Sequence, residues 1–90
     1  MYKPQLLEKL RIVKLAKTNG DDHIIPKLRE ELKELLEVLD TPRNHSTIEE
    51  VADVIIMLQQ YIYHYRVVSP LRFWINYKLA RTLKIFKERR

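Results

Sequence analysis

The sequence predicts an all-α protein that folds as an antiparallel four-helix bundle in a single domain, residues 1–90. Apolar residues recur at three- and four-residue spacing, which is typical of amphipathic helices. No alternation of period two competes with this pattern. Four segments carry it, residues 4–18, 26–40, 47–66 and 71–88. The connections between them are short, and short connections favour antiparallel neighbours.

Prolines and the single glycine mark the ends of these segments. Pro4, Pro26 and Pro70 each stand at the start of a helical pattern, where a missing backbone N–H costs little. Pro42 follows the second pattern, where the chain must leave the helix. Gly20 is the expected C-terminal stop of the first helix.

The composition limits the kind of protein. Ninety residues bury only a modest core, so association with a second copy would add useful stability. The absence of cysteine fits a reducing compartment, and we expect a cytoplasmic protein. Apolar runs are too short for a membrane span. The N-terminal MYKPQLLEKL lacks the apolar segment and cleavage site of a signal peptide.

The net charge of +5 is unevenly distributed. Lys and Arg dominate residues 70–90, whereas Asp and Glu dominate residues 29–40. A basic segment of this kind suggests an anionic partner, either a nucleotide or a nucleic acid.

Asp53 lies within an otherwise aliphatic run, residues 51–58, where a charge resists burial unless something pairs with it. Glu50 precedes it by three residues, so the two carboxylates share one helical face. Glu31 and Glu34 have the same spacing on the preceding helix. If these helices are antiparallel neighbours, four carboxylates converge and repel unless a cation neutralises them. Hard oxygen ligands select Mg²⁺, with Mn²⁺ as a substitute.

A purely structural explanation of the acids stays open at this point. Glutamates near a helix N-terminus suit the helix dipole and form a solvated face. Ser46 with Glu49, or Thr47 with Glu50, would make a capping box at the start of the third helix. Neither explanation accounts for Asp53.

The acidic pattern resembles that of a known superfamily. E-x-x-E followed by E-x-x-D is similar to the signature of the all-α NTP pyrophosphatases, which are MazG-like nucleotide pyrophosphohydrolases. The segments KLREELKELLEVL and IEEVADVIIML resemble the two motif helices of that superfamily. YKLARTL resembles a Lys-x-x-Arg-Thr element of its small, often phage-encoded members. The resemblance covers roughly residues 26–90.

The resemblance implies hydrolysis of an NTP or dNTP to the monophosphate and pyrophosphate, with Mg²⁺ as cofactor. It implies a homodimer or homotetramer in which a neighbouring subunit helps to close the nucleotide pocket. The implied metal ligands are Glu31, Glu34, Glu50 and Asp53. One acid serves as general base, with Glu34 and Glu37 as the two candidates. The implied contacts to the substrate phosphates are Lys78, Arg81 and Lys84.

A second function remains possible from the sequence. The basic last helix also suits a non-catalytic protein that binds nucleic acid or regulates a partner. Tyr61, Tyr63 and Tyr65 point to different sides of a helix, so at least one is expected outside the core. His23, His45 and His64 lack metal-ligand spacing, and we expect structural or exposed roles for them.

Overall fold

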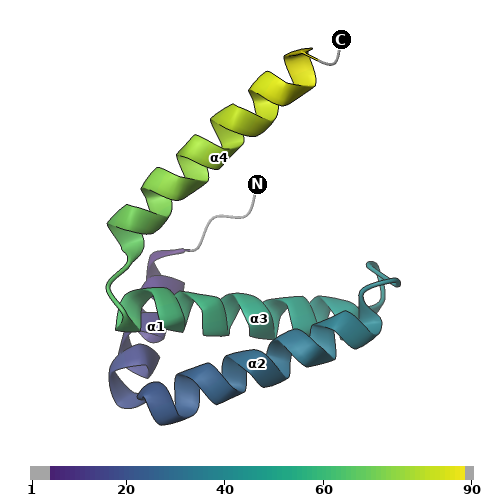
Figure 1. The fold of residues 1–90 in the computed structure, drawn as a ribbon. Helices are drawn as coiled ribbons and strands as arrows, with labels where there is room; N and C mark the ends of the chain where they lie inside the picture. The colour runs from purple at the N-terminus through teal and green to yellow at the C-terminus, as the bar shows by residue number, and fades with distance from the viewer. Residues whose placement is uncertain (1–4, 89–90) are drawn as a thin grey trace.

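The computed structural model describes residues 5–88, which form helices joined by short turns, with no strand in that range (Figure 1). The all-α class and the four predicted helices are confirmed. No helix in this range is both long and apolar enough to cross a membrane. The four elements are α1 (Leu6–Thr18), α2 (Asp21–Val38), α3 (His45–His64) and α4 (Val68–Glu88).

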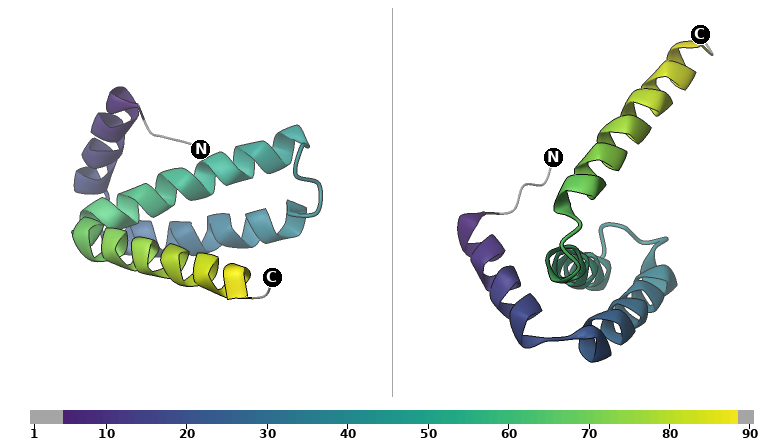
Figure 2. Two further views of the ribbon diagram at one scale, coloured as in Figure 1. Left: turned by 90° about the horizontal axis from the view of Figure 1, so that it is seen from above. Right: turned by 60° about the vertical axis from the view of Figure 1, so that its left-hand side comes forward.

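Three of the four helices pack together, and the fourth leaves them. α2 and α3 lie side by side as an antiparallel pair, and α1 packs against α3. α4 projects away from this three-helix body (Figures 1 and 2). The Cα radius of gyration is 15.6 Å, against about 12 Å expected for a compact chain of this length. One chain therefore leaves the predicted bundle open, and completion by a second copy stays a prediction.

The helix boundaries differ most from expectation at the starts of α2 and α4, and those of α3 lie two residues earlier than expected. α2 begins at Asp21, five residues earlier than predicted, so Pro26 lies inside the helix and does not precede it. Its missing N–H removes one bond, to a carbonyl of the first turn, and the acidic first turn suits the helix dipole. Gly20 does not act as a left-handed stop, because its φ of −122° and ψ of −170° are extended and it caps the start of α2. Pro70 lies in the first turn of α4, and Pro4 is outside the described residues.

The predicted capping boxes at the start of α3 are wrong. Asn44 is the N-cap, and its Oδ1 accepts a hydrogen bond from the Ser46 backbone N–H at 3.0 Å. Thr47 is buried, and its hydroxyl donates to the carbonyl of Val38 at 3.0 Å and lies 3.1 Å from the Thr41 hydroxyl. This bond ties the start of α3 to the end of α2. Neither glutamate of the predicted boxes is consumed by capping.

Replacing Asn44 by alanine should lower the free energy of unfolding by about 1 kcal/mol. The reason is that the Ser46 backbone N–H, in the first turn of α3, loses its hydrogen-bond acceptor. Urea denaturation followed by circular dichroism measures the change. Arg43→Ala in the same loop is the control and should change stability by less than about 0.5 kcal/mol. Equal losses in the two variants would contradict the cap assignment.

The core of the described chain is small. Its buried apolar side chains come from α1, α2 and α3, and they are Ile12, Ala16, Ile24, Val54 and Met57. Buried Gln60 accepts a hydrogen bond from Asn19 at 3.0 Å, which joins the end of α1 to α3. The predicted apolar stripe of α4 contributes no buried residue. Association with a second surface would therefore add substantially to stability.

A hydrogen-bonded cluster holds the end of α3 against the start of α2. Tyr65 donates its hydroxyl to Asp21 at 2.7 Å, and His64 Nε2 lies 2.7 Å from the same oxygen. The hydrogen bond from Tyr65, and after it the one from His64, lower the pKa of Asp21. In turn, the hydrogen bond to the Asp21 carboxylate raises the pKa of Tyr65 to about 12. His64 thus has the structural role expected for it.

Candidate metal centre

Carboxylates from two neighbouring helices converge between α2 and α3. Glu31 of α2 and Glu50 and Asp53 of α3 each offer an oxygen, and these oxygens all lie within 4.8 Å of one another. The antiparallel pairing makes this possible, because it places the middle of α2 opposite the first half of α3. Glu31 is the most enclosed of the three, with 5% of its surface exposed. A buried glutamate inside an acidic group is costly without a positive partner.

Glu34 joins the same group from the next turn of α2. It is close enough to Glu50 to share a hydrogen bond when one of the two is protonated. The structure therefore brings three of the four expected metal ligands into one group, and Glu34 adjoins that group through Glu50. Their role as ligands stays a prediction. Glu37 is exposed and lies outside the converging group.

The site disfavours its own negative charge. Burial raises the pKa of Glu50, and the carboxylates of Glu34, Glu31 and Asp53 raise it further. Asp53 is exposed as a whole, but partial burial of its carboxylate raises the pKa of Asp53, with Glu31 adding to the effect. Oε2 of Glu31 and Oε2 of Glu50 are buried and have no hydrogen-bond donor among residues 5–88. Unpaired buried carboxylate oxygens are suitable ligands for a hard divalent cation.

Lys27 supplies positive charge at one side of the site. Its ammonium lies 3.1 Å from Oε1 of Glu31 and 3.4 Å from Oε1 of Glu30. The hydrogen bond to Glu31, followed by that to Glu30, raises the pKa of Lys27, and the lysine's charge partly offsets the raised pKa of Asp53. Lys27 is not among the site residues predicted from the sequence. Its four-residue spacing to Glu31 was the available signal, because such pairs meet on a helix.

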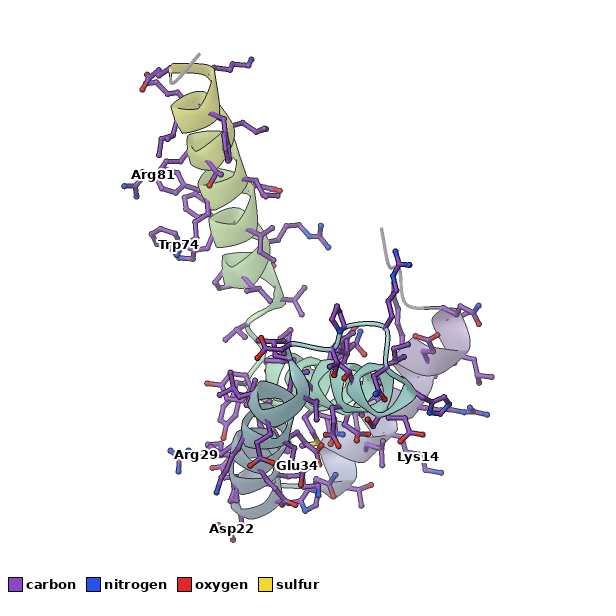
Figure 3. All side chains as sticks on the ribbon, turned by 90° about the vertical axis from the view of Figure 1, so that its right-hand side faces the viewer. Lys14, Asp22, Arg29, Glu34, Trp74 and Arg81 are labelled. Carbon is purple, nitrogen blue, oxygen red and sulfur yellow. The ribbon has the colours of Figure 1, made fainter. Side chains whose placement is uncertain are left out.

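The three residues expected to contact phosphate lie elsewhere. Lys78, Arg81 and Lys84 are exposed on α4, which projects from the body that carries the carboxylates. In Figure 3, Arg81 lies far out on α4, well separated from Glu34 on α2. Within one chain, these cations and the acidic group are not brought together.

The raised pKa values predict how stability depends on pH and on metal. Without metal, folded Glu50 and Asp53 keep their protons to a higher pH than the unfolded chain does, because their pKa values are raised. Glu50 and Asp53 therefore contribute most to stability at pH values below their ordinary pKa values, 4.5 and 3.8. This contribution is lost as the pH rises through their raised pKa values in the folded protein. Asp21, whose pKa is lowered, contributes in the opposite direction.

Mg²⁺ or Mn²⁺ should reverse the loss at neutral pH. A cation at 100 times its Kd adds about 2.7 kcal/mol of stability, and this gain should shrink as the carboxylates protonate. Thermal unfolding at pH 4.5, 6 and 7.5, with and without 5 mM (~) MgCl₂ or MnCl₂, measures both trends. A metal effect that is equal at all three pH values would contradict the assignment to this group.

Comparison of the chain with protein-family models, with curated proteins and with solved structures found no match.

Proposed function

We propose that the protein is a Mg²⁺-dependent nucleoside triphosphate pyrophosphohydrolase that converts an NTP or dNTP to the monophosphate and pyrophosphate. The observation that supports this most directly is the convergence of Glu31, Glu50 and Asp53 from two antiparallel helices. The buried unpaired oxygens of Glu31 and Glu50, and the raised pKa values of Glu50 and Asp53, support a place for a cation. The resemblance of the two motif helices to the MazG-like superfamily supplies the reaction.

The chain's own side chains would divide the work. Glu31, Glu34, Glu50 and Asp53 would hold the ion. A bound Mg²⁺ supplies charge neutralisation at the phosphates and activation of a water molecule. Glu34 is half-buried beside Glu50 and is better placed than exposed Glu37 to take the proton of the attacking water.

Positive side chains would hold the triphosphate. Lys27, which lies 3.1 Å from Oε1 of Glu31, would be the cation on this chain available to a phosphate oxygen beside the acids. Lys78, Arg81 and Lys84 would contribute from a neighbouring chain, because their own α4 carries them away from the acids. The proposal therefore includes a homodimer or homotetramer.

Product analysis with a panel of NTPs and dNTPs tests the proposal. With Mg²⁺, we expect one monophosphate and one pyrophosphate per nucleotide, and no product with EDTA. Glu31→Gln should abolish turnover, whereas the matched change at its exposed neighbour, Glu30→Gln, should leave turnover within about twofold. Release of inorganic phosphate and a diphosphate would contradict the reaction. Absence of turnover on every nucleotide by a folded protein would contradict an enzymatic function.

One observation favours a second function, binding of single-stranded nucleic acid. Phe73, Trp74 and Tyr77 form an exposed aromatic cluster on α4, with ring centroids 5.4–6.4 Å apart. Aromatic rings next to Lys and Arg are the means by which such proteins stack bases and hold phosphates. Binding to a fluorescent oligonucleotide should then weaken with salt and with Trp74→Ala, and should be unaffected by Asp53→Asn. Loss of binding in Asp53→Asn would contradict this second function.

A further inference from the structure

The single chain exposes more surface than a compact protein of its mass. Its accessible surface is 7998 Å², whereas a folded monomer of 10.9 kDa exposes about 5,600 Å². The excess is therefore about 2,400 Å² per chain. Permanent dimers bury 2,000–5,000 Å² or more in total (~), so the excess is large enough for a stable interface.

Much of this surface is an apolar stripe on α4. Its first members, Val68, Leu71 and Ile75, line a small cavity of about 210 Å³ against α1 and α3. The same stripe continues along the helix as Leu79, Leu83 and Phe86, at successive turns of one face. Leu83 and Phe86 are each 62% exposed. The start of the stripe thus has a partner in its own chain, and the rest has none among the described residues.

An apolar groove lies on the body between α1 and α3. It has a volume of about 530 Å³, and its aliphatic lining includes Ile48, Val51 and Ile55 of α3. Gln59 lines both this groove and the smaller cavity, so the two hollows adjoin. The Oε1 atom of Gln59 is buried without a hydrogen-bond donor from residues 5–88. The groove is therefore an uncovered continuation of the place where α4 starts.

The turn before α4 holds that helix away from its own groove. Val67 N–H bonds to the Ile62 carbonyl, and Arg66 N–H bonds to the Tyr63 carbonyl, which is the hydrogen-bond pattern of a Schellman turn. Arg66 has a φ of 55°, in the left-handed region that this turn requires. Asp21 also fixes the residues at this end of α3. Folding α4 back over its own body would break these bonds.

Charge favours a second copy of this chain as the occupant. α4 contains five Lys and Arg and one Glu, whereas residues 5–67 contain nine Lys and Arg and eleven Asp and Glu. The helix is positive and residues 5–67 are negative overall, so α4 of one copy is attracted to the body of another, while the charges at the groove itself, Glu8 and Arg11, balance. α3 and α4 also match in length, at 20 and 21 residues.

We propose that two copies of the chain exchange α4. In this dimer, the C-terminal half of α4, with Leu79, Leu83 and Phe86, lies in the partner's groove against the first half of α3. The arrangement is isologous, because each copy gives one helix and receives one. It completes a four-helix bundle twice, with the fourth helix of each bundle coming from the other chain.

The exchange does not depend on the proposed catalysis. With 100° per residue on a helix, Glu50 and Asp53 lie roughly 140–160° around α3 from Ile55 of the groove. Docking of α4 therefore leaves the carboxylate group open on the other side, and phosphate contacts from Lys78, Arg81 and Lys84 would then come from a further pair of chains, as in a homotetramer. Failure of the exchange and failure of the metal site are distinguishable, because a variant of one is expected to leave the other unchanged.

Sedimentation equilibrium of the full chain tests the exchange. The native protein should be a dimer. Leu83→Glu should raise the dimer dissociation constant by at least about a hundredfold, because the two-fold symmetry of the dimer buries one new glutamate in each of its two grooves. Ile85→Glu, on the same helix but off the stripe, is the matched control and should remain dimeric. Metal-induced stabilisation should persist in both variants. A monomeric native protein, or equal association of both variants, would overturn the proposal.

A disulfide test distinguishes exchange from closure within one chain. The natural sequence contains no cysteine, so a Val51→Cys, Leu83→Cys double variant places one thiol in the groove and one on α4. Under mild oxidation, exchange should give a covalent dimer on a non-reducing gel. A covalent monomer would show that α4 folds onto its own body and would overturn the proposal, as would the absence of any cross-link. Circular dichroism confirms that each variant is folded.

Discussion

Replacing Asp53 by asparagine should lower Mg²⁺-dependent turnover by at least about 100-fold and should raise the melting temperature of the metal-free protein. The loss of turnover follows from removal of a ligand, since even outer-shell changes at metal sites cost 10–100-fold (~). The gain in stability follows from the raised pKa of Asp53, which shows that burial and Glu31 disfavour its charge. Pyrophosphate release and differential scanning calorimetry measure the two effects.

The two effects together distinguish a metal site from a structural acid. If Asp53 had only a structural role, Asp53→Asn would lower the stability of the protein and would not alter its stabilisation by metal. Asp40→Asn removes the same charge from a position after α2 that lies outside the acidic group, and it should change neither turnover nor the metal response. Full turnover in Asp53→Asn would eliminate Asp53 from the site.

Ile24→Ala should lower the free energy of unfolding by about 3 kcal/mol, the largest loss expected from any single change. Ile24 is completely buried in α2, and removal of such a side chain costs both transfer energy and a cavity, roughly 2–5 kcal/mol. Small domains are stable by only 5–15 kcal/mol (~). For a chain of this length, the melting temperature should fall by more than about 12 °C.

Leu36→Ala on the same helix provides the comparison. Leu36 is 70% exposed, so its truncation should change stability by less than about 0.5 kcal/mol. Guanidinium titrations of both variants at one protein concentration give the two values. Similar losses at the two positions would mean that Ile24 does not lie in the main core.

The sequence was sufficient to predict the helices, because each has a strong three- and four-residue period. It was less informative about where they begin. Pro26 indicated a start, but the acidic pair before it begins the helix earlier at Asp21. Asn44 was overlooked as a cap because two Ser/Thr–Glu pairs follow it closely. Local signals compete at such ends, and only the folded contacts decide between them.

The convergence of the acids was predictable, whereas the position of the cations was not. Glu31 and Asp53 could be placed together by assuming only that adjacent helices are antiparallel. The distance between the acids and Lys78 depends on the direction of α4, which the turn at Arg66 determines. An arginine in a left-handed conformation has no clear signature in a single sequence, because glycine is the usual residue there.

The bond from the Thr47 hydroxyl to the Val38 carbonyl has a consequence for changes in chain length. A residue inserted into α3 after Thr47 would rotate everything that follows by about 100°, which would carry Glu50 and Asp53 away from Glu31. A residue inserted between Pro42 and Arg43 would leave that register intact at a small entropic cost. Insertions and deletions in evolution should therefore be tolerated in the loop and eliminated from the first turns of α3.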